Sequence, residues 1–207
     1  MRTPRAFLTF GLAALTSGAL WALPATPAQA DIYVAVSGAG STWSQNAVDQ
    51  WRRNVNQYGL TINFAGTGSS DGRNKFKEGT VDFAVTEIPY GISDQGTGVA
   101  DPPPTRGFAY MPIVAGGTSI MYNLTIGGQR VTQLRLSGET LAKIFTGVIT
   151  MWNDDAIKAD NPGLAKYLPA KRIVPVVRSD GSGTTAQFTT WLANQYPALL
   201  NDYCGRA

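Results

Sequence analysis

Three short stretches rich in glycine, serine and threonine carry the chemistry that this sequence can support. They are GAGST (residues 38–42), GTGSSDG (66–72) and SDGSGTT (179–185), and Arg178 directly precedes the last one. Each leads from a predicted strand into a predicted helix, so it would gather backbone N–H groups and hydroxyls at the positive end of a helix dipole. Such turns bind anions. Because all the donors except one arginine are neutral, we expect a small tetrahedral anion.

A single turn of this kind is weak evidence, because serine and threonine cap ordinary helices and glycine shapes ordinary turns. Three of them favour a ligand site, since open α/β sheets bind ligands beyond the carboxyl ends of their strands. Residues 68–72 also fit the G-x-S-x-G pattern of serine hydrolases, with Ser70 as nucleophile. The chain has no histidine, which argues against that catalysis and against His-containing metal sites. Neither GAGSTW nor GTGSS has the G-K-[ST] ending of a nucleotide-hydrolysing phosphate loop.

Residues 1–30 are typical of a secretory signal peptide. Arg2 and Arg5 precede an apolar run, and the stretch ends in PAQA, an A-x-A cleavage pattern. Removal of these two arginines lowers the formal net charge from +3 to +1. A near-neutral chain with scattered basic residues lacks the footprint of a nucleic-acid-binding protein. No later apolar segment is long enough to cross a bilayer, so we expect a soluble exported protein in the periplasm, outside the cell or at its surface.

The elements that would hold the first two turns alternate between strands and helices. Strands are predicted at 32–36, 60–64 and 81–85, and helices at 43–58 and 73–78. Gly59 and Gly79 supply the stop signals of the two helices. This β-α-β-α-β order predicts an α/β fold with a parallel sheet and right-handed crossovers.

A second block of elements follows a long loop. Residues 89–107 are rich in glycine, proline, aspartate and threonine, which predicts a surface loop. Beyond it we expect an apolar stretch at 108–124, a helix opened by Ser137, a polar helix around 153–160, a strand at 172–177 and a helix at 184–194. The chain therefore divides into a predicted leader, 1–30, a first α/β lobe, 31–107, and a second α/β lobe, 108–207.

Four motifs, GAGSTW, GTGSSDG, VDFAVTEIPY and RSDGSGTT, closely resemble in order and spacing the phosphate-binding proteins that serve bacterial phosphate ABC transporters. The resemblance runs from about Val36 to Asn194. It implies a two-lobed periplasmic-binding-protein-like fold, with helices on both faces of its sheets and the anion between the lobes. It also implies a protein that is not an enzyme, needs no cofactor or metal, and hands inorganic phosphate to a membrane permease.

The resemblance also implies which residues contact the ligand. The family's contacts fall on Thr42, the backbone of Trp43, Ser69, Glu87, Arg178, Ser182, Gly183 and Thr184. Asp180 falls where the arginine has its orienting partner, and Ser41 and Ser70 are supporting residues. Glu87 is a departure, because the family usually has aspartate there and glutamate reaches one methylene further.

Two features leave alternatives open. Family members are considerably longer than this chain, so the resemblance implies a fold that is incomplete at its C-terminus and a monomer only when complete. The lone Cys204 is then either a free thiol or the partner of a cysteine in the missing part. A secreted or surface domain used for adhesion, signalling or scavenging without a transporter is the alternative function. A fragment that folds poorly and binds nothing is the third.

Overall fold

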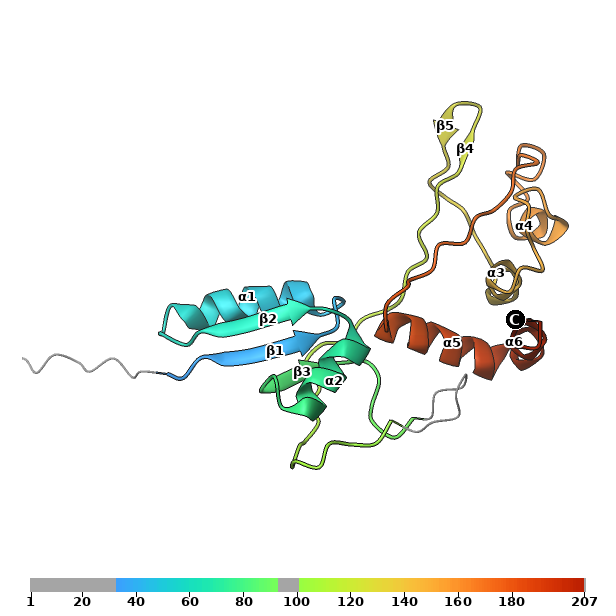
Figure 1. Ribbon diagram of the computed structural model, residues 1–207. Helices are drawn as coiled ribbons and strands as arrows, with labels where there is room; N and C mark the ends of the chain where they lie inside the picture. The colour runs from blue at the N-terminus through green and yellow to red at the C-terminus, as the bar shows by residue number, and fades with distance from the viewer. Residues whose placement is uncertain (1–32, 93–100, 207) are drawn as a thin grey trace, which may run out of the picture. The chain divides into compact units, whose positions relative to one another are not determined.

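The computed structural model describes residues 33–92 and 101–206 (Figure 1). The predicted signal peptide therefore lies outside the described residues. In the part of the chain that is described, no helix has both the length and the apolar character needed to span a membrane.

The first group of elements is built on a three-stranded parallel sheet. Its strands are β1 (Val36–Gly40), β2 (Ile62–Gly66) and β3 (Phe83–Val85), in the order β2-β1-β3. Helices α1 (Gln45–Asn56) and α2 (Ser69–Glu78) connect them, with α1 packed on β2 and α2 on β1 and β3 (Figure 1). This arrangement confirms the predicted α/β fold with a parallel sheet.

The register of the sheet brings the carboxyl ends of its strands to one edge. Gly40 at the end of β1 pairs with Gly66 at the end of β2 and with Val85 at the end of β3. The predicted turns overlap these strand ends: Ser41 and Thr42 of the first turn, Thr67 and Gly68 of the second, and Glu87 come within two residues after them. The sheet therefore delivers them to the same place, as expected for ligand sites of open α/β sheets.

The predicted position of the first strand is wrong by several residues. The strand runs over VSGAG, residues 36–40, and not over 32–36, and Val34 before it is exposed. A Cβ at Gly38 would lie 2.2 Å from Cζ of Phe83, and one at Gly72 of α2 would lie 2.4 Å from Cα of Gly40. Neighbours this close leave no room for side chains, so the central strand does not have the apolar pattern of a buried strand.

The second helix starts earlier than predicted. It begins at Ser69 rather than at residue 73, so most of the predicted turn GTGSSDG is helical. Its C-terminus agrees with the sequence, because Gly79 adopts the left-handed conformation with φ of 77°. The early start places Ser69 and Ser70 in the first turn of the helix.

The second group of elements contains a hairpin and four helices. They are β4 (Thr125–Ile126), β5 (Gln129–Arg130), α3 (Gly138–Phe145), α4 (Asp155–Asp160), α5 (Gly183–Gln195) and α6 (Pro197–Cys204). Their apolar core consists of Leu124, Ile144, Ile149, Trp152, Ile157, Leu168 and Ile173. Helices α3, α4 and α5 were predicted, and Ser137 caps α3 by accepting a hydrogen bond from the Thr140 N–H, at 3.2 Å. The division of the chain into lobes at residue 107 stays a prediction.

The predicted strand at 172–177 is wrong. Arg172 forms an isolated bridge with Met151 and Ile173 is buried in the core, but Val174, Val176 and Val177 are exposed, Val176 by 87%. Among the described residues no strand pairs with this segment, and an apolar run becomes a strand only when a neighbour supplies its hydrogen bonds. The hairpin was missed although its Gly127-Gly128 loop, with φ of 57° and 81°, is a typical two-residue hairpin turn.

Candidate anion-binding site

The structure brings the three Gly/Ser/Thr turns into contact. The Gly68 N–H of the second turn donates to the Gly40 carbonyl of the first, at 2.9 Å. The Ser70 N–H donates to the Gly181 carbonyl of the third turn, at 3.1 Å. The sequence separates the last turn from the others by more than a hundred residues, so tertiary structure alone assembles this arrangement.

Glu87 lies at the point where the turns meet. Its two carboxylate oxygens accept hydrogen bonds from the Ser41 hydroxyl at 2.8 Å and from the Ser69 hydroxyl at 2.5 Å. Ser41 and Ser69 are both buried. A Cβ at Gly183 would lie 2.1 Å from Oε2 of Glu87 and 2.4 Å from the Ser69 hydroxyl oxygen, so only glycine fits there without a shift. The longer glutamate thus points into the cluster and not away from it.

Arg178 and Asp180 form an ion pair at the entrance to the third turn. Nε of Arg178 donates to Oδ1 of Asp180 at 2.7 Å, and Nη2 contacts the other carboxylate oxygen. The hydrogen bonds raise the pKa of Arg178 and lower the pKa of Asp180 below its usual value. Nη1 of Arg178 makes a long contact of 3.4 Å with the Thr42 hydroxyl. The guanidinium is therefore oriented by Asp180 and keeps one nitrogen directed toward the first turn.

The third turn supplies a helix N-terminus. Ser182 caps α5 by accepting a hydrogen bond from the Thr185 N–H at 3.2 Å, and Gly183 and Thr184 are the first two residues of the helix. N–H groups at these positions have no partner within their own helix. The Trp43 N–H, in contrast, donates to the Ser41 hydroxyl oxygen at 3.2 Å. All eight predicted ligand residues and the three supporting residues thus lie in the turns or in the segment that meets them.

Two residues that no motif predicted contact the backbone at Glu87 and just after it. Nε2 of Gln187 on α5 donates to the Glu87 carbonyl at 2.7 Å. The buried Arg73 on α2 donates from Nη1 to the carbonyls of Ile88 and Pro89, at 3.3 and 3.1 Å. Arg73 and Gln187 each lie one helical turn after a predicted site residue, a spacing that faces the same side of a helix.

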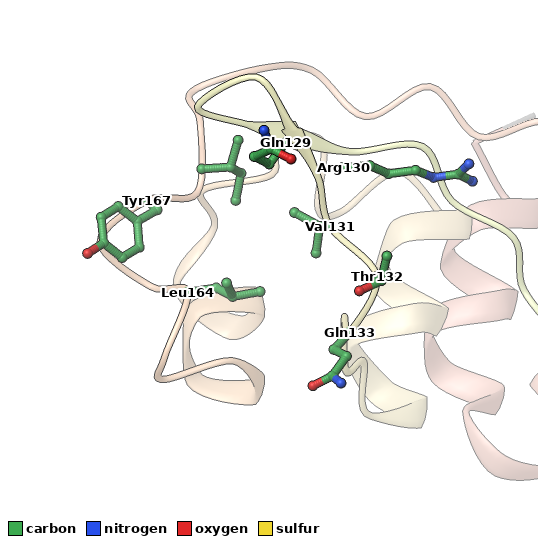
Figure 2. A pocket seen from close by; sticks show the side chains of 8 residues that line it. Gln129, Arg130, Val131, Thr132, Gln133, Leu164 and Tyr167 are labelled. Carbon is green, nitrogen blue, oxygen red and sulfur yellow. The ribbon is translucent and has the colours of Figure 1, made fainter.

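Two pockets are lined by residues that the structure describes. One of about 1000 Å³ opens beside the cluster and is lined by Ser41, Trp43, Glu87 and Gln187 together with apolar residues such as Phe83 and Met111. The other, of about 350 Å³, lies at the β4–β5 hairpin, where Gln129, Val131 and Tyr167 line it (Figure 2). None of the predicted anion ligands lines this second pocket. In residues 33–92 and 101–206 no group of three metal-ligating side chains has the geometry to hold a metal ion.

Known proteins are similar in sequence to this chain over the region that contains these turns. The family model described as "PBP superfamily domain" matches residues 25–199. The chain is 37% identical over 161 residues to the Phosphate-binding protein PstS of Xylella fastidiosa, covering 77% of this chain and 41% of that protein. It is 36% identical over 159 residues to PstS3 of Mycobacterium bovis, covering 76% and 41%. The identity to PstS of Methanocaldococcus jannaschii is 32% over 164 residues, covering 77% and 40%. The chain thus spans about two fifths of the length of these relatives.

Proposed function

The chain belongs to the PBP superfamily, and we propose that it acts as an exported binding protein that captures inorganic phosphate and delivers it to the membrane permease of an ABC transporter. The observation that carries the proposal is the convergence of the three turns, Glu87 and Arg178 on one site. The names of the relatives support phosphate as the ligand. Capture and delivery require no bond to be made or broken, so the protein is not an enzyme.

The ligand is held from several elements at once. The hydroxyls of Thr42 and Ser69, the backbone of Trp43 and the start of α5 at Ser182, Gly183 and Thr184 surround it. Arg178 adds the positive charge, and its planar fork suits the oxygens of a tetrahedral anion. Glu87 is the acceptor for a proton on phosphate, which sulfate lacks. The predicted units 31–107 and 108–207 are the two lobes that contribute these groups.

Isothermal titration of the purified protein with phosphate, sulfate and nitrate tests the binding step. We expect saturable phosphate binding with one site, and much weaker binding of the two other anions. A protein that melts cooperatively and binds no phosphate would contradict the proposal. Deletion of the gene and measurement of phosphate uptake by the intact cells then tests delivery. Unchanged uptake at low phosphate concentration would favour a surface domain that scavenges phosphate without a transporter.

A further inference from the structure

Positive charge is distributed unevenly along the described part of the chain. Residues 125–172 hold seven basic and four acidic side chains, a net charge of +3. The other described residues, 33–92, 101–124 and 173–206, hold eight of each kind and are formally neutral. The whole positive excess of the described residues therefore lies in the stretch that begins with the β4–β5 hairpin and ends at Arg172.

Most of the basic side chains in this stretch have no ion pair. Lys143 and Lys158 are paired with Glu139 and Asp155, at 2.6 and 2.8 Å. The other five are exposed and form no salt bridge within residues 33–92 and 101–206. They are Arg130, Arg135, Lys166, Lys171 and Arg172. We call these five side chains the basic surface.

The remaining acidic side chains of the stretch are engaged with the backbone. Asp154 accepts a hydrogen bond from the Ala156 N–H at the start of α4, at 2.9 Å. Asp160 at the end of α4 accepts one from the Ser137 N–H, at 2.7 Å. Neither carboxylate forms an ion pair with the basic surface, so the positive charge of that surface faces the solvent.

The basic surface comes from two segments that lie side by side. Arg130 is in β5 and Arg135 follows it, whereas the three other residues come after α4 (Figure 1). Asn161 joins the segments, because its amide nitrogen donates to the Arg135 carbonyl at 2.6 Å and its oxygen accepts from the Arg135 N–H at 2.8 Å. Tyr167 and the hairpin also line one pocket (Figure 2). The charges are thus collected around the hairpin.

This arrangement fits an extended negative surface better than a small anion or a protein. Arg130 and Tyr167 extend in different directions from the pocket that they line, so the basic groups do not converge on one point (Figure 2). Lysine is depleted in protein–protein interfaces, and two of the five residues are lysines. Tyr167 is 53% exposed, with Nζ of Lys166 at 4.8 Å from its ring centre. Tyrosine is enriched where a protein meets lipid headgroups.

We propose that the basic surface docks the protein on the anionic phospholipid headgroups of a membrane. Each lysine or arginine close to such a membrane strengthens binding about fivefold, so several together give a reversible attachment. Salt weakens this attachment, because the side chains are exposed and the attraction is screened. The inference goes beyond the proposed function and does not depend on phosphate, although a protein held at a membrane is close to any permease in it.

Sedimentation with lipid vesicles, in buffer without phosphate, tests the proposal on the full chain. At low ionic strength we expect the protein to bind vesicles that contain phosphatidylglycerol and not vesicles of phosphatidylcholine alone. We expect about 1 M salt, at which the screening length falls to about 3 Å, to release it. Absence of binding to the anionic vesicles would overturn the proposal. Binding to soluble polyglutamate without binding to vesicles would also overturn it, and would favour an acidic polypeptide as the partner.

Two triple variants then test whether the basic surface makes the contact. The first removes three of its charges, by Arg130→Gln, Lys166→Gln and Lys171→Gln. The control removes three exposed or half-exposed charges elsewhere, by Arg52→Gln, Arg53→Gln and Arg206→Gln. We expect the affinity for anionic vesicles to fall roughly tenfold or more in the first variant and much less in the control. Equal losses in the two folded variants would show a dependence on net charge alone and overturn the role of the basic surface.

The same proteins separate this inference from the proposed function. All are purified in the same way, so residues outside the described part contribute equally to vesicle binding. None of the six substituted residues belongs to the candidate anion-binding site, and we expect both variants to bind phosphate as the unaltered protein does. Loss of vesicle binding with phosphate binding retained would support the basic surface as a separate site. Loss of both in the first variant alone would overturn the assignment of a separate surface.

Discussion

Arg178 is the residue that should supply positive charge to the proposed site. Its side chain is 39% exposed and is held by Asp180 in a two-pronged contact, so a ligand meets a guanidinium that is already oriented. Arg178→Ala should weaken phosphate binding by roughly 1.5–3 kcal/mol, the range for a hydrogen bond to a charged group. Isothermal titration measures this loss. Arg172→Ala is the control, since Arg172 is an exposed arginine six residues earlier on the same segment, and equal affinities of the two folded variants would remove Arg178 from the site.

Glu87 is the residue that should separate phosphate from sulfate. Both anions are tetrahedral, but only phosphate has a proton to donate to the carboxylate near neutral pH. Opposite sulfate, the carboxylate faces a second acceptor, and the unmade charged hydrogen bond costs about 1.5–3 kcal/mol. Glu87→Gln replaces this acceptor by an amide that can donate. We expect the variant to admit sulfate, measured by competition of the two anions.

Glu78→Gln provides the control for this selectivity experiment, because Glu78 ends α2 on an exposed position and undergoes the same chemical change. An unchanged preference for phosphate in folded Glu87→Gln would show that the carboxylate does not discriminate between the two anions.

At the scale of elements, patterns with a local cause were predictable and those with a tertiary cause were not. The stop at Gly79 and the cap at Ser137 depend on backbone conformation and one hydrogen bond, and both follow from the sequence. The position of β1 was predicted wrongly because its glycines are required by close contacts with Phe83 and α2, which lie elsewhere in the sequence. Residues 172–177 were misjudged for the same reason, since an apolar run does not reveal whether a partner strand is present.

The features of the candidate site also separate into those with a local cause, which were predictable from the sequence, and those with a tertiary cause, which were not. Its glycine, serine and threonine turns are visible as motifs, because caps and tight turns require those residue types. The contacts of Gln187 and Arg73 with the backbone near Glu87 have no motif, since they depend on how α5 and α2 approach the loop after β3. The carboxylate of Glu87 was expected to face the ligand, but its use of both serine protons could be found only from coordinates.

The contact between α2 and β1 supports a prediction about stability. Alanine usually stabilises a helix by about 0.5–1 kcal/mol relative to glycine. At Gly72, however, the new Cβ would lie 2.4 Å from Cα of Gly40 and 2.7 Å from the Ala39 carbonyl oxygen, both of them backbone atoms. Overpacking of this kind costs about 1–3 kcal/mol, so the clash outweighs the helix propensity and Gly72→Ala should lower the free energy of unfolding.

Urea unfolding of Gly72→Ala measures this effect, and Gly163→Ala is its control, because a Cβ at Gly163 has no neighbour within 4 Å. A Gly72→Ala variant at least as stable as Gly163→Ala would contradict this prediction. It would mean that α2 can move away from β1 without lowering the free energy of unfolding. Since α2 carries Ser69, such a movement should also weaken phosphate binding.

At the scale of the whole molecule, the absence of histidine and the hydrogen-bonded aspartates together set the dependence of stability on pH. Backbone and side-chain hydrogen bonds from Ser37 lower the pKa of Asp82 below its ordinary value of 3.8, and Lys75 and Thr67 do the same for Asp71. A group whose pKa is lowered by folding stabilises the protein above its unfolded pKa and loses that contribution as the pH falls through the folded pKa. Burial raises the pKa of Tyr90 above its ordinary value of 10.0. This group therefore contributes stability below pH 10.0, and that contribution is lost as the pH rises through the folded pKa.

These signs predict a stability that is flat from about pH 5 to about pH 9 and that falls on both sides of this range. The melting temperature, followed by circular dichroism in phosphate-free buffers, measures it, and phosphate is left out because a ligand that titrates near neutrality would add its own pH dependence. Asp82→Asn should make the acid side less steep, because asparagine has no proton to gain. Asp155→Asn, at a side chain that is 97% exposed, should change it less than Asp82→Asn, since the Asp155 carboxylate is held by one surface contact with Lys158. A fall in melting temperature between pH 8 and pH 6 would contradict the prediction, because with no histidine in the chain it would require another side chain whose pKa folding has moved to near neutrality.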